Sequence, residues 1–233
     1  MEATARVPGR RLLAVILGWG AATAAVYGLI VLLARLVARA FVRSHLGDFS
    51  ASFVLAAYLL LFAALWLGFG GWRGLARTLG FRYTSWVYLL LAPVFWLATV
   101  LIGAIVAVPF QRWLGPPQSN AVPLIKTAVD PYATVVLVFT VVLLAPACEE
   151  MLFRGALFGW LRGRAPVGIA AFVSAALFAA AHRFPPALIV LFVFGLSAAL
   201  VYQRTGSTLN TFAMHAIQNG VAIAAVYSGL VRG

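Results

Sequence analysis

The sequence predicts an all-α fold, a polytopic membrane helix bundle with about seven transmembrane helices. Hydrophobic residues make up 64% of the 233-residue chain and charged residues only 9%. Soluble domains carry roughly 25% charged residues, so this chain has too few of them to cover a surface that faces water. Several apolar stretches also reach the roughly 20 residues that a helix needs to cross a bilayer. We therefore expect a multi-pass protein of a cell membrane, a bacterial plasma membrane in the simplest interpretation.

The predicted spans follow one another along the whole chain, at about 12–34, 51–70, 86–110, 132–161, 166–183, 187–203 and 208–230. The first is too long for the h-region of a signal peptide, so we expect it to stay uncleaved. The second ends in a glycine-rich turn, and the third and fourth each contain a proline that predicts a local kink. A proline-rich loop at 115–131 separates these two. With no internal repeat, the chain is predicted to be one transmembrane domain, 1–233, in which an eighth span stays open.

The basic residues indicate a lipid partner. The net charge is +12, from 17 Lys+Arg against 5 Asp+Glu, which in a soluble protein would suggest nucleic acid. Here the basic residues lie between apolar runs, where membrane topology and lipid headgroups explain them, so no nucleic-acid partner is expected. Arg35, Arg39 and Arg43 recur every four residues and predict a helix face that lies on anionic headgroups.

The fourth predicted span contains the densest group of charges. Glu149 and Glu150 are adjacent at the end of an apolar run. An ionisable group at this depth costs roughly 2.5 kcal/mol or more unless it is paired or faces water. Arg154 follows Glu150 by four residues, with the acid N-terminal, which favours a helical ion pair. Glu149 is rotated by about 100° and cannot share that arginine equally. We therefore expect Glu150 to be a structural partner and Glu149 to face a cavity.

Three more polar residues lie within the later spans. His182 closes the fifth, and His215 and Asn219 share one face of the seventh, four residues apart. At 1.5 Å per residue all of them fall within the membrane interior, at depths that allow them to meet the glutamates in one polar cavity. Each residue alone has a structural interpretation, as a packing histidine or an interhelical hydrogen bond. Their conjunction indicates a site. The single cysteine, Cys148, is predicted to be a small buried core residue.

Three motifs occur in order on successive predicted helices. They read E-E-x-x-x-R at 149–154, F-x-x-x-H at 178–182 and H-x-x-x-N at 215–219. Together they resemble the signature of the CPBP family, which comprises CAAX prenyl endopeptidases of Rce1 type and bacterial relatives that include bacteriocin-processing proteins. The resemblance covers a catalytic half at about 130–230 and leaves the first half of the chain unmatched.

The resemblance implies an intramembrane endopeptidase that cleaves membrane-associated peptides or proteins. Glu149 and His182 would activate a water, His215 and Asn219 would hold the oxyanion, and Glu150 with Arg154 would brace the site. The family is often called metalloprotease-like, and Glu149, His182 and His215 are a possible zinc set. A metal-free glutamate mechanism is equally compatible, since the chain has no H-E-x-x-H motif. The alternative function is a non-catalytic membrane protein, such as an immunity factor, a scaffold or a transporter accessory.

Overall fold

The computed structural model describes residues 7–36, 46–115 and 130–229, and within them every regular element is a helix. The arginine face predicted at 35–43 and the proline-rich loop at 115–131 lie largely outside these residues. The elements that position the site are α1 (Gly9–Leu36), α3 (Leu46–Phe69), α4 (Gly71–Arg77), α5 (Trp86–Ala107), α6 (Gln111–Leu114), α8 (Pro131–Phe139), α9 (Ala145–Glu150), α10 (Gly159–Arg162), α11 (Val167–Ala181), α12 (Leu188–Thr205) and α13 (Thr208–Tyr227).

Five of the described helical segments are long and apolar enough to cross a membrane, so the chain is a multi-pass membrane protein. They are Gly9–Leu32, Gly47–Phe69, Trp86–Leu114, Pro131–Arg162 and Pro185–Thr205. The other two predicted spans are also helices. However, α11 has only 15 residues, and α13 has 20 but carries several polar side chains along its length. The predicted all-α membrane bundle is confirmed. The prediction of seven full spans was based on apolar length alone, and among the described residues five helices meet the length and composition of a span.

The fourth segment, Pro131–Arg162, is one continuous helix whose hydrogen-bond register changes twice. It starts at Asp130, whose side chain accepts a hydrogen bond from the backbone N–H of Ala133 at 2.9 Å, with a proline in the first turn. Two π-helical segments, Thr140–Leu144 and Met151–Phe158, lie on either side of α9. π-Helical turns occur frequently at functional sites. Here they enclose the short segment that carries both glutamates.

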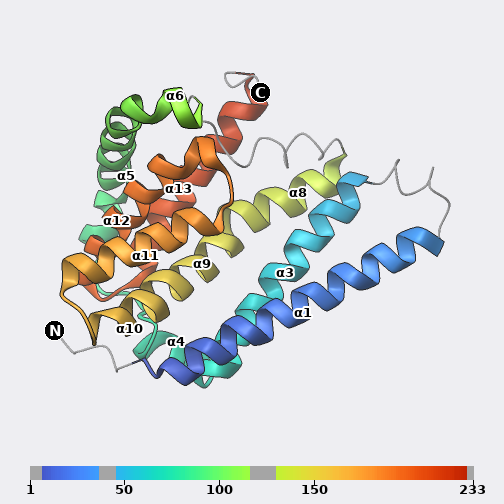
Figure 1. Ribbon diagram of the computed structural model, residues 1–233, viewed down its shortest axis with the longest axis horizontal. Coiled ribbons are helices and arrows are strands. Elements are labelled where there is room, and N and C mark those ends of the chain that lie inside the picture. The colour runs from blue at the N-terminus through green and yellow to red at the C-terminus, as the bar shows by residue number, and fades with distance from the viewer. Residues whose placement is uncertain (1–6, 37–45, 116–129, 230–233) are drawn as a thin grey trace.

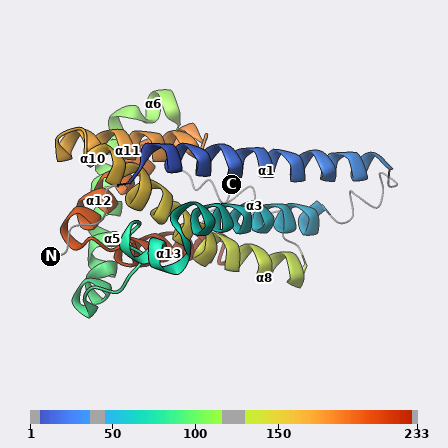
Figure 2. The ribbon, with the colours of Figure 1, turned by 90° about the horizontal axis from the view of Figure 1, so that it is seen from below.

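The long fourth helix lies between two groups of helices (Figure 1). On one side it contacts α3, which pairs along its length with α1. On the other side it contacts α11 and α13, which pack with α5 and α12. Figure 2 shows the same order from below, with α1, α3 and α8 side by side. The glutamates therefore lie where the N-terminal helix pair meets the C-terminal helices.

Small residues allow these helices to pack closely. A Cβ added at Gly195 of α12 would lie 3.0 Å from the Cα of Ala175 in α11. A Cβ added at Gly155 would lie 2.5 Å from the backbone carbonyl oxygen of Leu79, in the turn that follows α4. Small residues at helix contacts are typical of membrane bundles, because packing rather than the hydrophobic effect holds their helices together. Gly155 thus joins the fourth helix, just after its glutamates, to the N-terminal half.

Candidate active site

Three of the predicted site residues converge from three different helices. The Oε2 atom of Glu149, in α9, lies 3.9 Å from Nε2 of His182 and 3.8 Å from Nε2 of His215. His182 caps the C-terminus of α11, and His215 lies in the second turn of α13. The side chains are mostly buried, with exposed fractions of 12% for Glu149, 14% for His182 and 4% for His215. Glu149, His182 and His215 therefore lie together inside the helix bundle.

The hydrogen bonds of the two histidines decide what their Nε2 atoms can do. Nδ1 of His182 lies 2.8 Å from the carbonyl oxygen of Phe178, which can only accept, so Nδ1 carries the proton. Nδ1 of His215 lies 2.9 Å from Oε1 of Glu150 and donates to that carboxylate. In the neutral imidazoles both Nε2 atoms therefore present a lone pair toward Oε2 of Glu149. Oε2 of Glu149 is thus separated from each of these two acceptor nitrogens by a gap too long for a direct hydrogen bond, an arrangement suited to a bridging water.

The predicted ion pair between Glu150 and Arg154 is present and lies in the protein interior. Nη1 of Arg154 is 3.1 Å from Oε1 of Glu150, and both side chains are at most 1% exposed. The contact is an ion pair without hydrogen-bond geometry, since no guanidinium nitrogen has a hydrogen-bond partner among the described residues. The guanidinium carbon instead lies 4.2 Å from the ring centre of Phe178. Charge and ring contact thus hold Arg154 beneath Glu150, and Glu150 in turn holds His215.

Asn219 contacts the backbone of the fourth helix. Its Nδ2 donates to the carbonyl oxygen of Val141 at 2.8 Å. In the π-helical segment the N–H of Ala145 bonds to the carbonyl of Thr140, five residues back. The same register would pair Val141 with residue 146, which is a proline and has no N–H. The Asn219 amide therefore supplies the donor that Pro146 lacks, and no contact of its side chain with Glu149, His182 or His215 is seen in the described part of the chain.

Sequence reasoning missed a fourth side chain at Glu149. The phenol of Tyr58, in α3, donates a hydrogen bond to Oε1 of Glu149. The two carboxylate oxygens thus have separate neighbours, the phenol at Oε1 and the histidines at Oε2. The only signal in the sequence was a single tyrosine within an apolar span. Cys148 is fully buried, as predicted, and its Sγ donates to the backbone carbonyl of Tyr58 at 3.6 Å.

The distances within the possible zinc set of Glu149, His182 and His215 are longer than those of a zinc site. Zinc binds nitrogen and oxygen at about 2.0–2.2 Å, so two ligands of a tetrahedral site lie roughly 3.3–3.6 Å apart. The distances from Glu149 to the two histidines, 3.9 and 3.8 Å, are longer. Across residues 7–36, 46–115 and 130–229, no group of three or more His, Cys, Asp or Glu side chains is placed to hold a metal ion.

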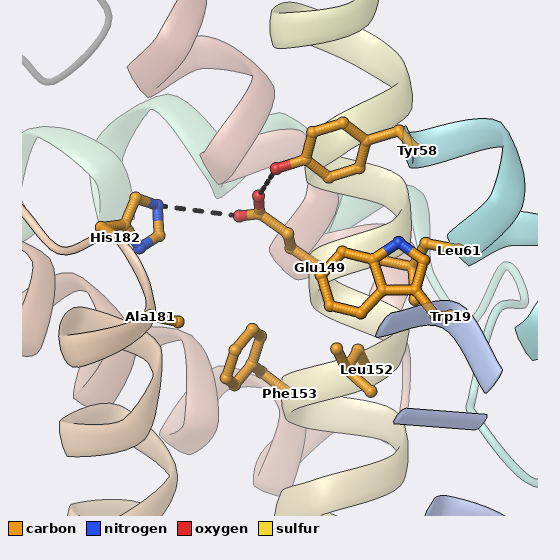
Figure 3. A pocket seen from close by; sticks show the side chains of 8 residues that line it. All are labelled: Trp19, Tyr58, Leu61, Glu149, Leu152, Phe153, Ala181 and His182. Carbon is orange, nitrogen blue, oxygen red and sulfur yellow. Dashed lines mark hydrogen bonds and ion pairs between the residues drawn. The ribbon is translucent and has the colours of Figure 1, made fainter. Parts of the chain in front are cut away.

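A cavity of about 310 Å³ opens beside Glu149 (Figure 3). Glu149, Tyr58 and His182 form its polar end, where the carboxylate points toward both partners. The remaining lining residues are apolar and come from α1, α3, α11 and the fourth helix. A substrate in this cavity would meet the carboxylate and an imidazole at one end and an apolar wall elsewhere.

One comparison with known proteins finds a family that matches the part of the chain carrying these residues. Residues 131–221 match the family described as Type II CAAX prenyl endopeptidase Rce1-like. No curated protein and no solved structure matches the chain. The matched region contains both glutamates, both histidines and Asn219, and it ends before the last turn of α13. Residues 131–221 of this multi-pass membrane protein are therefore similar to the Rce1-like, CPBP family of intramembrane endopeptidases.

Proposed function

We propose that the chain hydrolyses peptide bonds of membrane-associated peptides or proteins, with a water activated by Glu149 and His182. The observation that carries this proposal is that Oε2 of Glu149 lies across gaps of 3.9 and 3.8 Å from two acceptor nitrogens, those of His182 and His215. A water in the gap would donate its protons to the carboxylate and to an imidazole. Glu149 would then take one of these protons as the general base, while the hydrogen bond to the imidazole orients the water.

The reaction needs one proton to move twice. As the water oxygen attacks the carbonyl carbon of the scissile bond, Glu149 takes its proton and the carbonyl oxygen becomes an oxyanion. The protonated carboxyl then delivers that proton to the leaving nitrogen, the C–N bond breaks, and Glu149 is again ionised. Tyr58 fixes the carboxylate during both transfers, because its hydrogen bond occupies Oε1 and leaves Oε2 toward the water.

The oxyanion would be held by His215 and Asn219. Nδ1 of His215 is hydrogen-bonded to Glu150, so Nε2 would donate to the oxyanion only if the ring takes up a second proton. Asn219 uses one amide proton on the Val141 carbonyl and retains a second one. Preorganised donors to an oxyanion are worth roughly 3–4 kcal/mol each. Arg154 contributes indirectly, because it balances the charge of Glu150.

We place this activity in a bacterial plasma membrane, with the whole chain acting as one transmembrane domain. The test compares peptide termini in membranes of the native host that carry wild type, Glu149→Gln or Asp130→Asn. Asp130→Asn is a matched control, because it also turns a carboxylate into an amide, 19 residues earlier and at the start of the same helix. Termini present with wild type and the control but absent with Glu149→Gln would establish a protease.

Two outcomes would redirect the proposal. Identical terminus profiles in all three strains, with each variant accumulated normally, would indicate the non-catalytic membrane protein instead. Metal analysis of purified protein addresses the zinc alternative. Stoichiometric zinc in wild type that is lost in the His182→Ala, His215→Ala double variant would contradict the metal-free mechanism.

A further inference from the structure

The imidazole of His215 packs against aromatic rings from two other helices. The ring centre of Phe194, in α12, lies 4.9 Å from that of His215, with 57° between the ring planes. The ring of Phe178, in α11, lies 5.7 Å away and is nearly perpendicular to the imidazole, at 77°. Phe194 is only 4% exposed and belongs to a buried cluster that also contains Phe178 and Met214. The helix α12 therefore reaches the site through a side chain that has no polar group.

We propose that Phe194 is a positioning residue, which holds the imidazole of His215 in the orientation that directs Nε2 toward Glu149. This inference rests on the proposed function, in which His215 takes part in holding the oxyanion. It adds α12 to the helices that build the site, and it assigns Phe194 a role that is exerted through His215 rather than on the substrate.

The hydrogen bond to Glu150 fixes one atom of the imidazole and leaves the plane of the ring undetermined. Nδ1 of His215 lies 2.9 Å from Oε1 of Glu150, whereas Nε2 lies 3.8 Å from Oε2 of Glu149, which is too long for a direct hydrogen bond. A single hydrogen bond lets the ring tilt about the line that joins its two atoms, and the χ2 torsion of histidine adds little resistance because it is broad. Neighbouring side chains must therefore fix the ring plane. Phe194 is the closer of the two rings that contact His215 in the described part of the chain.

Phe194 also contacts the second group that flanks Glu150. The guanidinium carbon of Arg154 lies 4.2 Å from the ring centre of Phe178 and 5.7 Å from that of Phe194. Cation–π contacts of this length add to the ion pair between Arg154 and Glu150. The two rings thus lie against both partners of Glu150, its ion-pair partner and its hydrogen-bond donor.

Close packing of α12 on α11 sets the position of Phe194. A Cβ added at the next residue, Gly195, would lie 3.0 Å from the Cα of Ala175, so the two backbones approach closely at this level. Phe194 is not among the residues that line the cavity beside Glu149. Removal of its ring should therefore change the rate of turnover and leave substrate binding largely unaltered.

The experiment compares wild type, Phe194→Leu and Phe194→Tyr, purified in lipid nanodiscs. Phe194→Leu keeps an apolar side chain without the ring, and Phe194→Tyr retains the ring. Phe192→Leu is the matched control, because Phe192 lies on the same helix and its ring pairs with that of Phe172, which is 59% exposed. Two quantities are measured. They are the steady-state cleavage of a peptide that spans a Glu149-dependent cleaved bond, and the proton NMR signal of the Nδ1–H of His215, assigned by its loss in His215→Gln.

We expect Phe194→Leu to lower kcat by about tenfold or more with little change in KM, because displacement of a catalytic group by about 1 Å can cost roughly 100-fold in rate. The Nδ1–H signal should broaden in Phe194→Leu, since a mobile ring exposes that proton to exchange with water. Phe194→Tyr and Phe192→Leu should keep the kcat and the signal of wild type.

Several results would overturn the inference and leave the protease intact. They are an unchanged kcat per folded molecule in Phe194→Leu, a loss confined to KM, an equal loss in Phe192→Leu, or a lower kcat with an unchanged Nδ1–H signal. Phe194→Met, which also lacks the ring, replaces Phe194→Leu in both measurements if the leucine variant does not fold. Wild-type cleavage that does not depend on Glu149 would refute both proposals.

Discussion

Tyr58→Phe tests whether the N-terminal half takes part in catalysis. The substitution removes one oxygen and keeps the ring, so α3 retains its packing while Oε1 of Glu149 loses its donor. A hydrogen bond to a charged group contributes about 1.5–3 kcal/mol. At 1.36 kcal/mol per tenfold change in rate, its loss should lower kcat by roughly 10- to 150-fold. KM should change little, because the phenol lies at the polar end of the cavity and the apolar walls remain.

The assay is steady-state cleavage by purified protein in lipid nanodiscs, with a peptide taken from the Glu149-dependent termini. Tyr27→Phe is the matched control, since it removes a phenol from the neighbouring helix α1 at a side chain that is 59% exposed. Its kcat should equal that of wild type. Thermal unfolding of all three proteins separates a change in rate from a change in folding.

The reasoning about Tyr58 fails if Tyr58→Phe keeps the kcat of wild type at equal stability. It also fails if the loss appears entirely in KM, because the phenol would then bind substrate rather than fix the carboxylate. A reduced melting temperature with unchanged kcat per folded molecule would assign Tyr58 to packing alone.

Three other substitutions test the framework of the site by thermal unfolding in detergent. Gly155→Ala should lower the melting temperature and Gly168→Ala should not, because an added Cβ meets a backbone carbonyl at 2.5 Å in the first case and nothing within 4 Å in the second. Equal melting temperatures would contradict the close contact. Arg154→Ala should cost about 3–5 kcal/mol by leaving Glu150 as an unpaired buried charge, whereas the double variant Glu150→Gln, Arg154→Met should lose less. A larger loss in the double variant would argue against the ion pair. Asp130 accepts a hydrogen bond from a backbone N–H, which lowers the pKa of its carboxyl group below 3.8 in the folded protein. Its stabilisation of the helix start is therefore complete above pH 3.8 and is lost as the pH falls through the lower pKa of the folded state. The melting temperatures of wild type and Asp130→Ala should therefore converge below pH 3.8, and a constant difference would contradict this cap.

The sequence predicted those features that depend on spacing within one helix. The pair of Glu150 and Arg154 follows from the i, i+4 geometry, and the structure contains it. The meeting of Glu149 with the two histidines was expected from their conjunction, since few ionisable groups lie within the spans and all of these fall in the membrane interior. The α-helical secondary structure could also be predicted from the sequence, because a long apolar run in lipid can satisfy its backbone hydrogen bonds only within a helix.

Features that depend on contacts between helices could not be predicted from one sequence. Tyr58 and Glu149 are 91 residues apart, and hydropathy does not tell which face of α3 meets the fourth helix. The contact of Asn219 was hidden for another reason. A 3.6-residue period assigns the carbonyl left unpaired by Pro146 to residue 142, whereas the π-helical register shifts it to Val141. Likewise, the apolar length at 166–183 did not show that the helix there has only 15 residues.

The arrangement around Glu149 follows from the interactions that its neighbouring side chains already make. Arg154 forms an ion pair with Glu150, and Glu150 accepts a hydrogen bond from Nδ1 of His215. Nδ1 of His182 donates a hydrogen bond to the backbone carbonyl oxygen of Phe178 in α11. Each Nε2 is thereby left facing Glu149 without a proton, and the carboxylate, already bound by the Tyr58 phenol, has nothing to donate in return. The carboxylate and the two imidazole nitrogens are all acceptors, so Glu149 cannot form a direct hydrogen bond with either histidine. A molecule that donates protons is therefore favoured between them. In the proposed reaction that molecule is water, and the scissile carbonyl would reach it from the cavity beside Glu149.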